Sequence, residues 1–197
     1  LMKLKRALVH VTGVSSLFAA AFFSYDLPDL NRTTLKIIER RTLQETIAAI
    51  PKDCGIPSEL TSVILSQEVR GEASELDKLS AVKYEPGHLE KYGKKISNNP
   101  EVAREYASSH GPFQIMGWHC KFNFDGSRAD RCEWYQLHDL EISKREYCRV
   151  MNNCISKNEN VEPATKKYYG IFKCYNGSDK YAAEALEELK NESLSKI

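Results

Sequence analysis

"YASSHGPFQIMGW", residues 106–118, interrupts a charged chain with small and apolar residues, two glycines and one proline. The Gly111-Pro112 pair restricts the backbone at a turn. Gln114 then places a single amide among apolar side chains. These apolar side chains are Phe113, Ile115, Met116 and Trp118. The stretch predicts either the wall of a ligand site or the start of a buried helix, and the rest of the chain has to decide between them.

The first 21 residues have the pattern of a secretory signal peptide. Three basic residues precede an apolar stretch over residues 7–18, and an Ala-x-Ala site follows at residues 19–21. We expect cleavage after Ala21. The alternative is an uncleaved anchor, because the apolar character continues to Phe23 and approaches the roughly 20 residues that span a bilayer.

The charge balance argues against a polyanionic partner. The chain has 28 Lys and Arg against 27 Asp and Glu, and loss of three basic residues with the signal peptide leaves 25 against 27, a net charge of −2. Domains that bind nucleic acid are usually basic. We therefore expect no nucleic-acid partner. The export signal predicts a secreted or periplasmic location, with no stable membrane insertion after signal cleavage, and we expect a monomer.

Six cysteines follow the signal segment, an even number in a chain with an export signal. This combination predicts three disulfides. Fifteen pairings are possible for six cysteines. The spacing favours only the Cys120–Cys132 pair, which would close a short loop. A zinc site is disfavoured because the chain contains no Cys-x-x-Cys pair, and we expect neither a metal nor another cofactor.

The spacing of apolar residues predicts a mainly α fold with one small β element. A short strand is expected over residues 79–85, followed by a turn. The expected helices run over residues 33–50 before Pro51, 59–70 between a Ser58 cap and Gly71, 137–155, 164–175 closed by Gly177, and a last segment capped by Ser178.

Glu68 is the first candidate for chemistry. It lies four residues beyond Ile64 and eight beyond Leu60, which puts it on the apolar face of its helix. Burial and the negative end of the helix dipole both raise the pKa of a carboxyl group, and a general acid needs a raised pKa at neutral pH. The alternative is a solvent-facing glutamate at a frayed helix end.

Glu85 is the second candidate. It ends the expected strand on the same face as Lys83. A salt bridge between these two side chains would explain Glu85 as well as a catalytic role would.

Three separated segments occur in a particular order: Glu68 at a helix end, "SSHGPFQIMG", and "FKCYNG" near the C-terminus. This order resembles the lysozyme-like lytic transglycosylases and goose-type lysozymes, and most closely the bacterial and phage N-acetylmuramidase domain, over residues 56–189. The resemblance implies a lysozyme-like α+β fold. It divides the chain into a signal peptide at 1–21, a linker and helix at 22–55, and a lysozyme-like domain at 56–190.

The resemblance also implies roles for individual residues. Glu68 matches the catalytic acid/base, and "VKYEPGHL" resembles a strand with a Phe-Glu-x-His motif, which places Glu85 on the motif's glutamate and His88 slightly out of register. Val69 stands where a serine usually follows the catalytic glutamate, and the usual glycine pair is missing from "EVRGEASEL". The residues that match the family's sugar-binding segments are Gly111, Gln114, Ile115, Met116, Tyr175 and Asn176.

The function implied is cleavage of the β-1,4 bond between N-acetylmuramic acid and N-acetylglucosamine in peptidoglycan, with proton donation by Glu68. If Glu85 activates water across a gap of roughly 6.5–9.5 Å, the reaction is hydrolysis with inversion. If no second carboxylate is in reach, the muramyl 6-hydroxyl attacks instead and leaves an anhydro sugar. The alternative functions are an inactive secreted module that binds peptidoglycan, which Val69 makes conceivable, and an unrelated disulfide-rich protein.

Overall fold

The computed structural model describes residues 32–68, 77 and 80–194 of the 197-residue chain. The expected signal segment therefore lies outside the described residues. Contacts divide the chain into residues 1–41 and residues 42–197, and the second unit carries every candidate residue. Within the described residues, no helix is long and apolar enough to cross a membrane.

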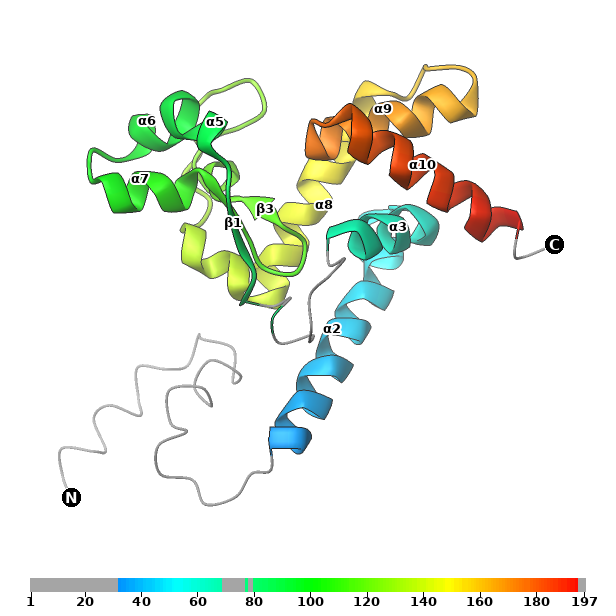
Figure 1. Ribbon diagram of the computed structural model, residues 1–197, viewed down its shortest axis with the longest axis horizontal. Coiled ribbons are helices and arrows are strands. Elements are labelled where there is room, and N and C mark those ends of the chain that lie inside the picture. Colours follow the sequence, from blue (N-terminus) through cyan, green and yellow to red (C-terminus); the bar gives the residue numbers. More distant parts are fainter. Residues whose placement is uncertain (1–31, 69–76, 78–79, 195–197) are drawn as a thin grey trace. The chain divides into compact units, whose positions relative to one another are not determined.

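The fold is mainly helical with a small antiparallel sheet (Figure 1). The longer helices are α2 (Arg32–Cys54), α3 (Ser58–Glu68), α8 (Leu140–Lys157), α9 (Ala164–Asn176) and α10 (Asp179–Leu194). Shorter helical segments are α5 (Pro86–His88), the π-helical η1 (Leu89–Gly93), α6 (Lys94–Ile96), α7 (Pro100–Tyr106), and the 3-10 turns η2 (Gly117–Cys120) and η3 (Trp134–His138).

The sheet consists of β1 (Val82–Tyr84), β2 (Ser108–His110) and β3 (Ile115–Met116), in that order. Lys83 pairs with Ser109, and Ser109 pairs with Met116 on its other side. The sequence predicted only the first strand, and over a longer range. The opening stretch is therefore not the start of a buried helix, because it forms the β2–β3 hairpin.

The hairpin turn depends on two left-handed residues, Gly111 with φ 71° and Gln114 with φ 47°. The Gly111 amide donates to the Ala81 carbonyl at 3.0 Å, and the Gln114 amide donates to the Gly111 carbonyl at 3.1 Å. A side chain at Gly111 would stand 2.3 Å from the Leu137 carbonyl oxygen. The backbone at this turn thus lies against η3 with no room for a Cβ.

The core is built where α3 packs against α10, and α9 against both α8 and α10. The periodic apolar face of α3 is buried, including Leu60 at 1% exposure and Ile64 at 0%. Tyr147 and Phe172 fill the centre from α8 and α9. Their burial removes a large apolar area from water, which is the main force holding these helices together.

All six cysteines are paired, as the sequence predicted. The three disulfides are Cys54–Cys148, Cys120–Cys132 and Cys154–Cys174. The first connects the end of α2 to α8 across 94 residues, and the third joins α8 to α9. The pairing is compatible with a secreted protein.

Several helix boundaries differ from the sequence prediction. Pro51 does not stop α2, which runs on to Cys54 and ends at Gly55, whose amide donates to the Pro51 carbonyl. The predicted helix over 137–155 is interrupted at Asp139, whose side chain caps α8 by accepting from the Glu141 and Ile142 amides. The helix predicted from Glu59 begins at Ser58, and its expected end lies outside the described residues.

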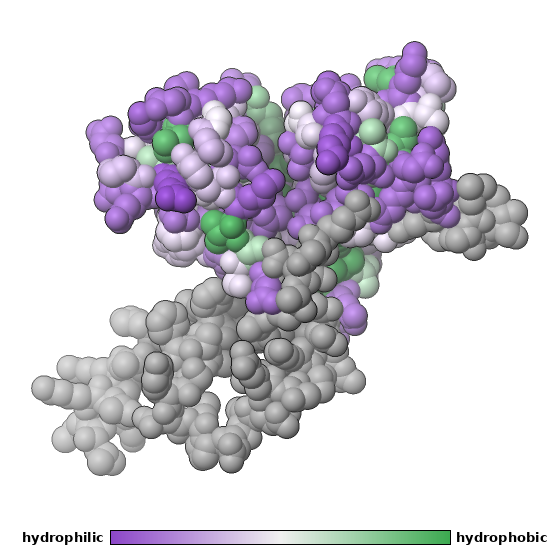
Figure 2. All heavy atoms as spheres, viewed as in Figure 1, coloured by the Kyte–Doolittle hydropathy of each residue, from purple (hydrophilic) through white to green (hydrophobic). Residues whose placement is uncertain are grey.

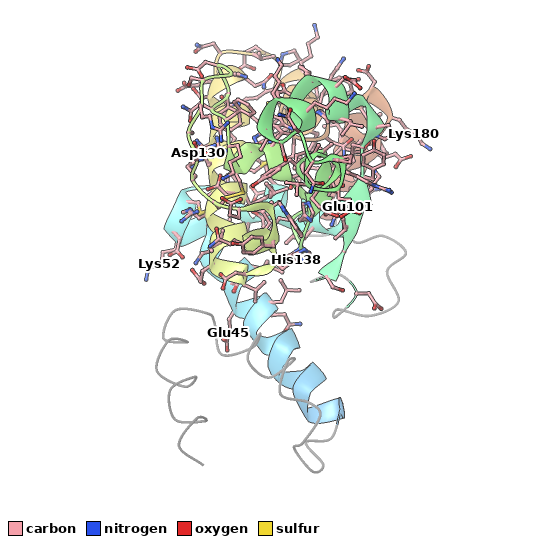
Figure 3. The ribbon with its side chains drawn as sticks, turned by 90° about the vertical axis from the view of Figure 1, so that its left-hand side faces the viewer. Glu45, Lys52, Glu101, Asp130, His138 and Lys180 are labelled. Carbon is pink, nitrogen blue, oxygen red and sulfur yellow. A yellow bond between two sulfur atoms is a disulfide. The ribbon has the colours of Figure 1, made fainter. Side chains whose placement is uncertain are left out.

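The starts of the last two helices agree with the sequence prediction. Pro163 precedes α9, and Gly177 ends it with φ 85°. The Ser178 hydroxyl accepts from the Tyr181 amide at the start of α10. Charges of both signs cover the described surface, for example Glu101, Asp130 and Lys180 (Figure 3).

Gly111→Ala is expected to lower the free energy of unfolding by about 3 kcal/mol or more, because it combines a left-handed alanine with a backbone clash. Gly126→Ala is the matched control, since Gly126 has φ 84° but nothing within 4 Å of the added Cβ. The control isolates the cost of the left-handed conformation, about 1–2 kcal/mol. Urea denaturation of both variants measures the difference, and equal losses would contradict the close contact with Leu137.

Candidate active site

Glu68 is the last residue of α3 and lies on the face that the helix buries. Two hydrogen bonds hold the preceding residues against α10. The Ser66 hydroxyl donates to one oxygen of Glu188, and the Gln67 amide donates to the other at 2.6 Å. The position of Glu68 is therefore fixed by packing and by a polar contact one residue away.

Three elements that are distant in sequence face the Glu68 carboxylate. Asn176, at the end of α9, and Tyr181, on α10, interact with it through their side chains. Lys83 and Glu85, from β1 and the residue after it, act on it through their charges. Glu85 and Asn176, two residues that the sequence analysis selected, thus both act on the pKa of Glu68.

Burial raises the pKa of Glu68 to about 7, against an ordinary value of 4.5. Interactions with Tyr181, Lys83 and Asn176 partly offset this effect, and the negative charge of Glu85 adds to it. The direction agrees with the prediction from the apolar face of α3, and desolvation is the dominant cause. A carboxyl group with this pKa holds its proton over much of the neutral range and can donate it.

Tyr181 is a neighbour of Glu68 that the sequence analysis did not select. Its hydroxyl is buried and makes no hydrogen bond of standard geometry within the described residues, although it lies close enough to interact with the carboxylate. Burial, and after it the charge of Glu68, raises the pKa of this hydroxyl, so it stays protonated. The sequence does contain a signal for Tyr181, because this residue shares a helix face with Ala185 and Leu189, which are buried. A tyrosine hydroxyl buried on such a face needs a polar partner.

Tyr175 points into the protein instead of toward the solvent. Its hydroxyl donates to the Phe113 carbonyl, and its ring meets Tyr147 edge to face at 5.9 Å. The charge of Glu68 adds to burial in raising the pKa of Tyr175 well above its usual range. Tyr175 therefore links α9 to the hairpin turn, and its hydroxyl already donates its hydrogen bond within the protein.

The Gln114 side chain also makes its hydrogen bonds within the protein. Its amide group donates to the Gly111 carbonyl at 2.8 Å and to the Ala81 carbonyl at 3.4 Å, and it accepts from the Ser109 hydroxyl at 2.9 Å. These bonds tie the hairpin to the residue before β1. A hydrogen bond from this amide to a sugar would require one of them to break.

The remaining hairpin residues differ in exposure. Ile115 is buried at 2% exposure, and Met116 is half-buried in β3. Gly111 contributes only its backbone. His110 is fully buried, its Nε2 meets the Glu105 carbonyl at 2.7 Å, and burial lowers its pKa to about 4, so it is neutral.

The salt bridge that the sequence allowed is present. Lys83 Nζ lies 2.9 Å from Glu85 Oε1, and both side chains retain solvent exposure. His88 follows closely, and its amide donates to the Glu85 carbonyl at 3.0 Å. The His88 ring stacks on Tyr92, and burial lowers its pKa.

Alternation along β1 turns Lys83 and Glu85 away from Val82 and Tyr84. The latter two line an open cavity of about 380 Å³ on the α7 side, which none of the candidate residues lines. Figure 2 shows the surface hollowed between the elements α5–α7 and α9–α10.

No group of three potential metal ligands occurs among the described residues. Comparison with known proteins found no match to a family model, to a curated protein or to a solved structure.

Glu68→Gln is expected to increase stability at pH 8 but not at pH 4. Below about pH 4.5 the folded and unfolded chains both hold the proton. As the pH rises to about 7, only the unfolded chain releases it, so the folded state loses about 1–3 kcal/mol of stability that the glutamine variant keeps. Denaturant melts at both pH values, with the exposed Glu159→Gln as control, measure this difference. A pH-independent difference would contradict the raised pKa.

Proposed function

We propose that the chain is a peptidoglycan-cleaving glycosidase with a lysozyme-like fold, acting on the β-1,4 bond between N-acetylmuramic acid and N-acetylglucosamine. One observation carries the proposal: burial raises the pKa of Glu68 to about 7, and the charge of a second carboxylate, Glu85, acts on it. Separated protonation states of two carboxyl groups are what acid/base cleavage of a glycosidic bond requires. The order of motifs along the sequence points to the same chemistry.

In this proposal Glu68 donates its proton to the glycosidic oxygen while positive charge develops at the sugar carbon. Asn176, which is exposed, and Tyr181 orient the carboxyl group. Their interactions with the carboxyl group favour its ionised form and therefore stabilise Glu68 after it has lost its proton. The neighbouring tyrosines stay protonated and add no competing charge.

The second step decides the class of enzyme. Glu85 is close enough for its charge to act on Glu68, which favours hydrolysis, with Glu85 activating a water molecule. If Glu85 does not take part, the ionised Glu68 draws in the muramyl 6-hydroxyl, and the protein is a lytic transglycosylase.

Product analysis tests the proposal. Purified peptidoglycan digested with the wild-type protein is expected to yield reducing muramyl ends, whereas anhydro-muramyl ends, lighter by one water, identify a transglycosylase. Glu68→Gln is expected to lower the rate by about 10²–10⁴-fold, because it removes the general acid. Glu85→Gln lowers the rate strongly only in hydrolysis, and Glu90→Gln, on exposed η1, is the matched control.

A protein that sediments with peptidoglycan but releases no products is a binding module, and this result would contradict the enzymatic proposal. Activity in Glu68→Gln equal to that of the wild type would exclude Glu68 as the acid.

The pH dependence gives a second test. Since the acid must be protonated, kcat/KM is expected to fall as the pH rises through about 7, tenfold per unit at the high end. Initial rates on solubilised glycan strands between pH 4 and 9 measure this limb. A rate that stays constant up to pH 9 would contradict the assignment of Glu68.

A further inference from the structure

We propose that Lys83 is a positioning residue for this reaction: its ammonium group holds the Glu85 carboxylate and places a positive charge beside Glu68. The inference rests on the proposed function for its role in catalysis. It assigns to the lysine a task that neither the sequence motifs nor the candidate acid and base supply.

The geometry of β1 carries the argument. Lys83 and Glu85 are two residues apart on an extended segment, so their side chains leave the same face. The strand is held in register by the pairing of Lys83 with Ser109 and by the Glu85 amide, which donates to the Ala107 carbonyl at 3.1 Å. The 2.9 Å ion pair then joins the two side chain ends. The backbone of the strand is thus fixed, and the ion pair ties the Lys83 ammonium group to the Glu85 carboxylate.

The charged groups that act on Glu68 differ in sign, and Lys83 supplies the positive charge. From β1 come Lys83 and Glu85, and from α8, α9 and α10 come tyrosines whose raised pKa keeps them neutral. Glu188 on α10 accepts from Ser66 and Gln67 and acts on Tyr181. Lys83 lowers the pKa of Glu68 through its positive charge, whereas Glu85 raises it through its negative charge.

The opposite effects of Lys83 and Glu85 on the pKa of Glu68 have a chemical consequence. Two carboxylates in one site repel each other, which raises the pKa of at least one of them. Without a cation, the proton on Glu68 would be held more tightly and Glu85 would be free to turn away. Lys83 therefore keeps the acid able to donate and the second carboxylate in place.

Direct titration of Glu68 tests this inference without relying on activity. In protein labelled with ¹³C at the glutamate carboxyl carbons, Lys83→Met is expected to raise the pKa of Glu68 by roughly half a unit, and Glu85→Gln is expected to lower it by a similar amount. Lys83→Arg keeps the charge and is expected to restore the wild-type value. Lys95→Met removes an exposed lysine from α6 and is the matched control.

The activity profile gives the second readout. The basic limb of kcat/KM is expected to shift upward in Lys83→Met and to stay in place in Lys83→Arg and Lys95→Met. A Lys83→Met variant with lower activity but an unchanged Glu68 titration would show a merely structural role and overturn the inference. If the wild type does not cleave peptidoglycan, the proposed function fails, while the titration still decides whether Lys83 sets the charge at Glu68.

Discussion

Desolvation of one carboxyl group at the end of α3 is the constraint on which the site depends. The apolar face of α3 is buried against the other helices, and Glu68 continues that face by one more turn. Burial disfavours its charged form, and the Tyr181 hydroxyl, the Lys83 charge and the Asn176 amide only partly offset this. The folded protein therefore holds a proton that the unfolded chain would release, so the packing of the core is coupled directly to the chemistry of the site.

Much of this arrangement was readable from the sequence. The 3.6-residue spacing of Leu60 and Ile64 already placed Glu68 on the buried side, and its raised pKa follows from that placement. The even cysteine count predicted three disulfides, and the short spacing of Cys120 and Cys132 identified one of them correctly. Helix ends marked by a clear cap or a left-handed glycine, such as Ser178 and Gly177, were also predicted.

What the sequence did not predict depends on contacts between distant segments. β2 and β3 have three and two residues, too short for an alternating pattern, and they exist because Gly111 and Gln114 turn the chain against Ala81 and Leu137. The Gln114 amide was read as a sugar contact, whereas its bonds lie inside the hairpin.

Two further features were not predicted, because one depends on a side-chain cap and the other on packing between distant helices. Apolar spacing continues across Asp139 although its side chain starts a new helix there. Tyr181 looks like a core aromatic until α10 is packed on α3, and only then does its hydroxyl face Glu68.

The ion pair on β1 connects the two interpretations of Glu85 that the sequence left open. A salt bridge with Lys83 and a part in catalysis were alternatives on the strand pattern alone, yet the structure makes them compatible. Lys83 meets Oε1 of Glu85, and Oε2 makes no hydrogen bond or ion pair within the described residues. A carboxylate paired through one oxygen can still accept a proton from water through the other.

An exposed ion pair such as Lys83–Glu85 contributes little to stability, about 0–1 kcal/mol, so its effect here lies in geometry and local charge. Hydrolysis needs a second carboxylate that is ionised and held in place, whereas transglycosylation needs only Glu68, so the ion pair favours hydrolysis.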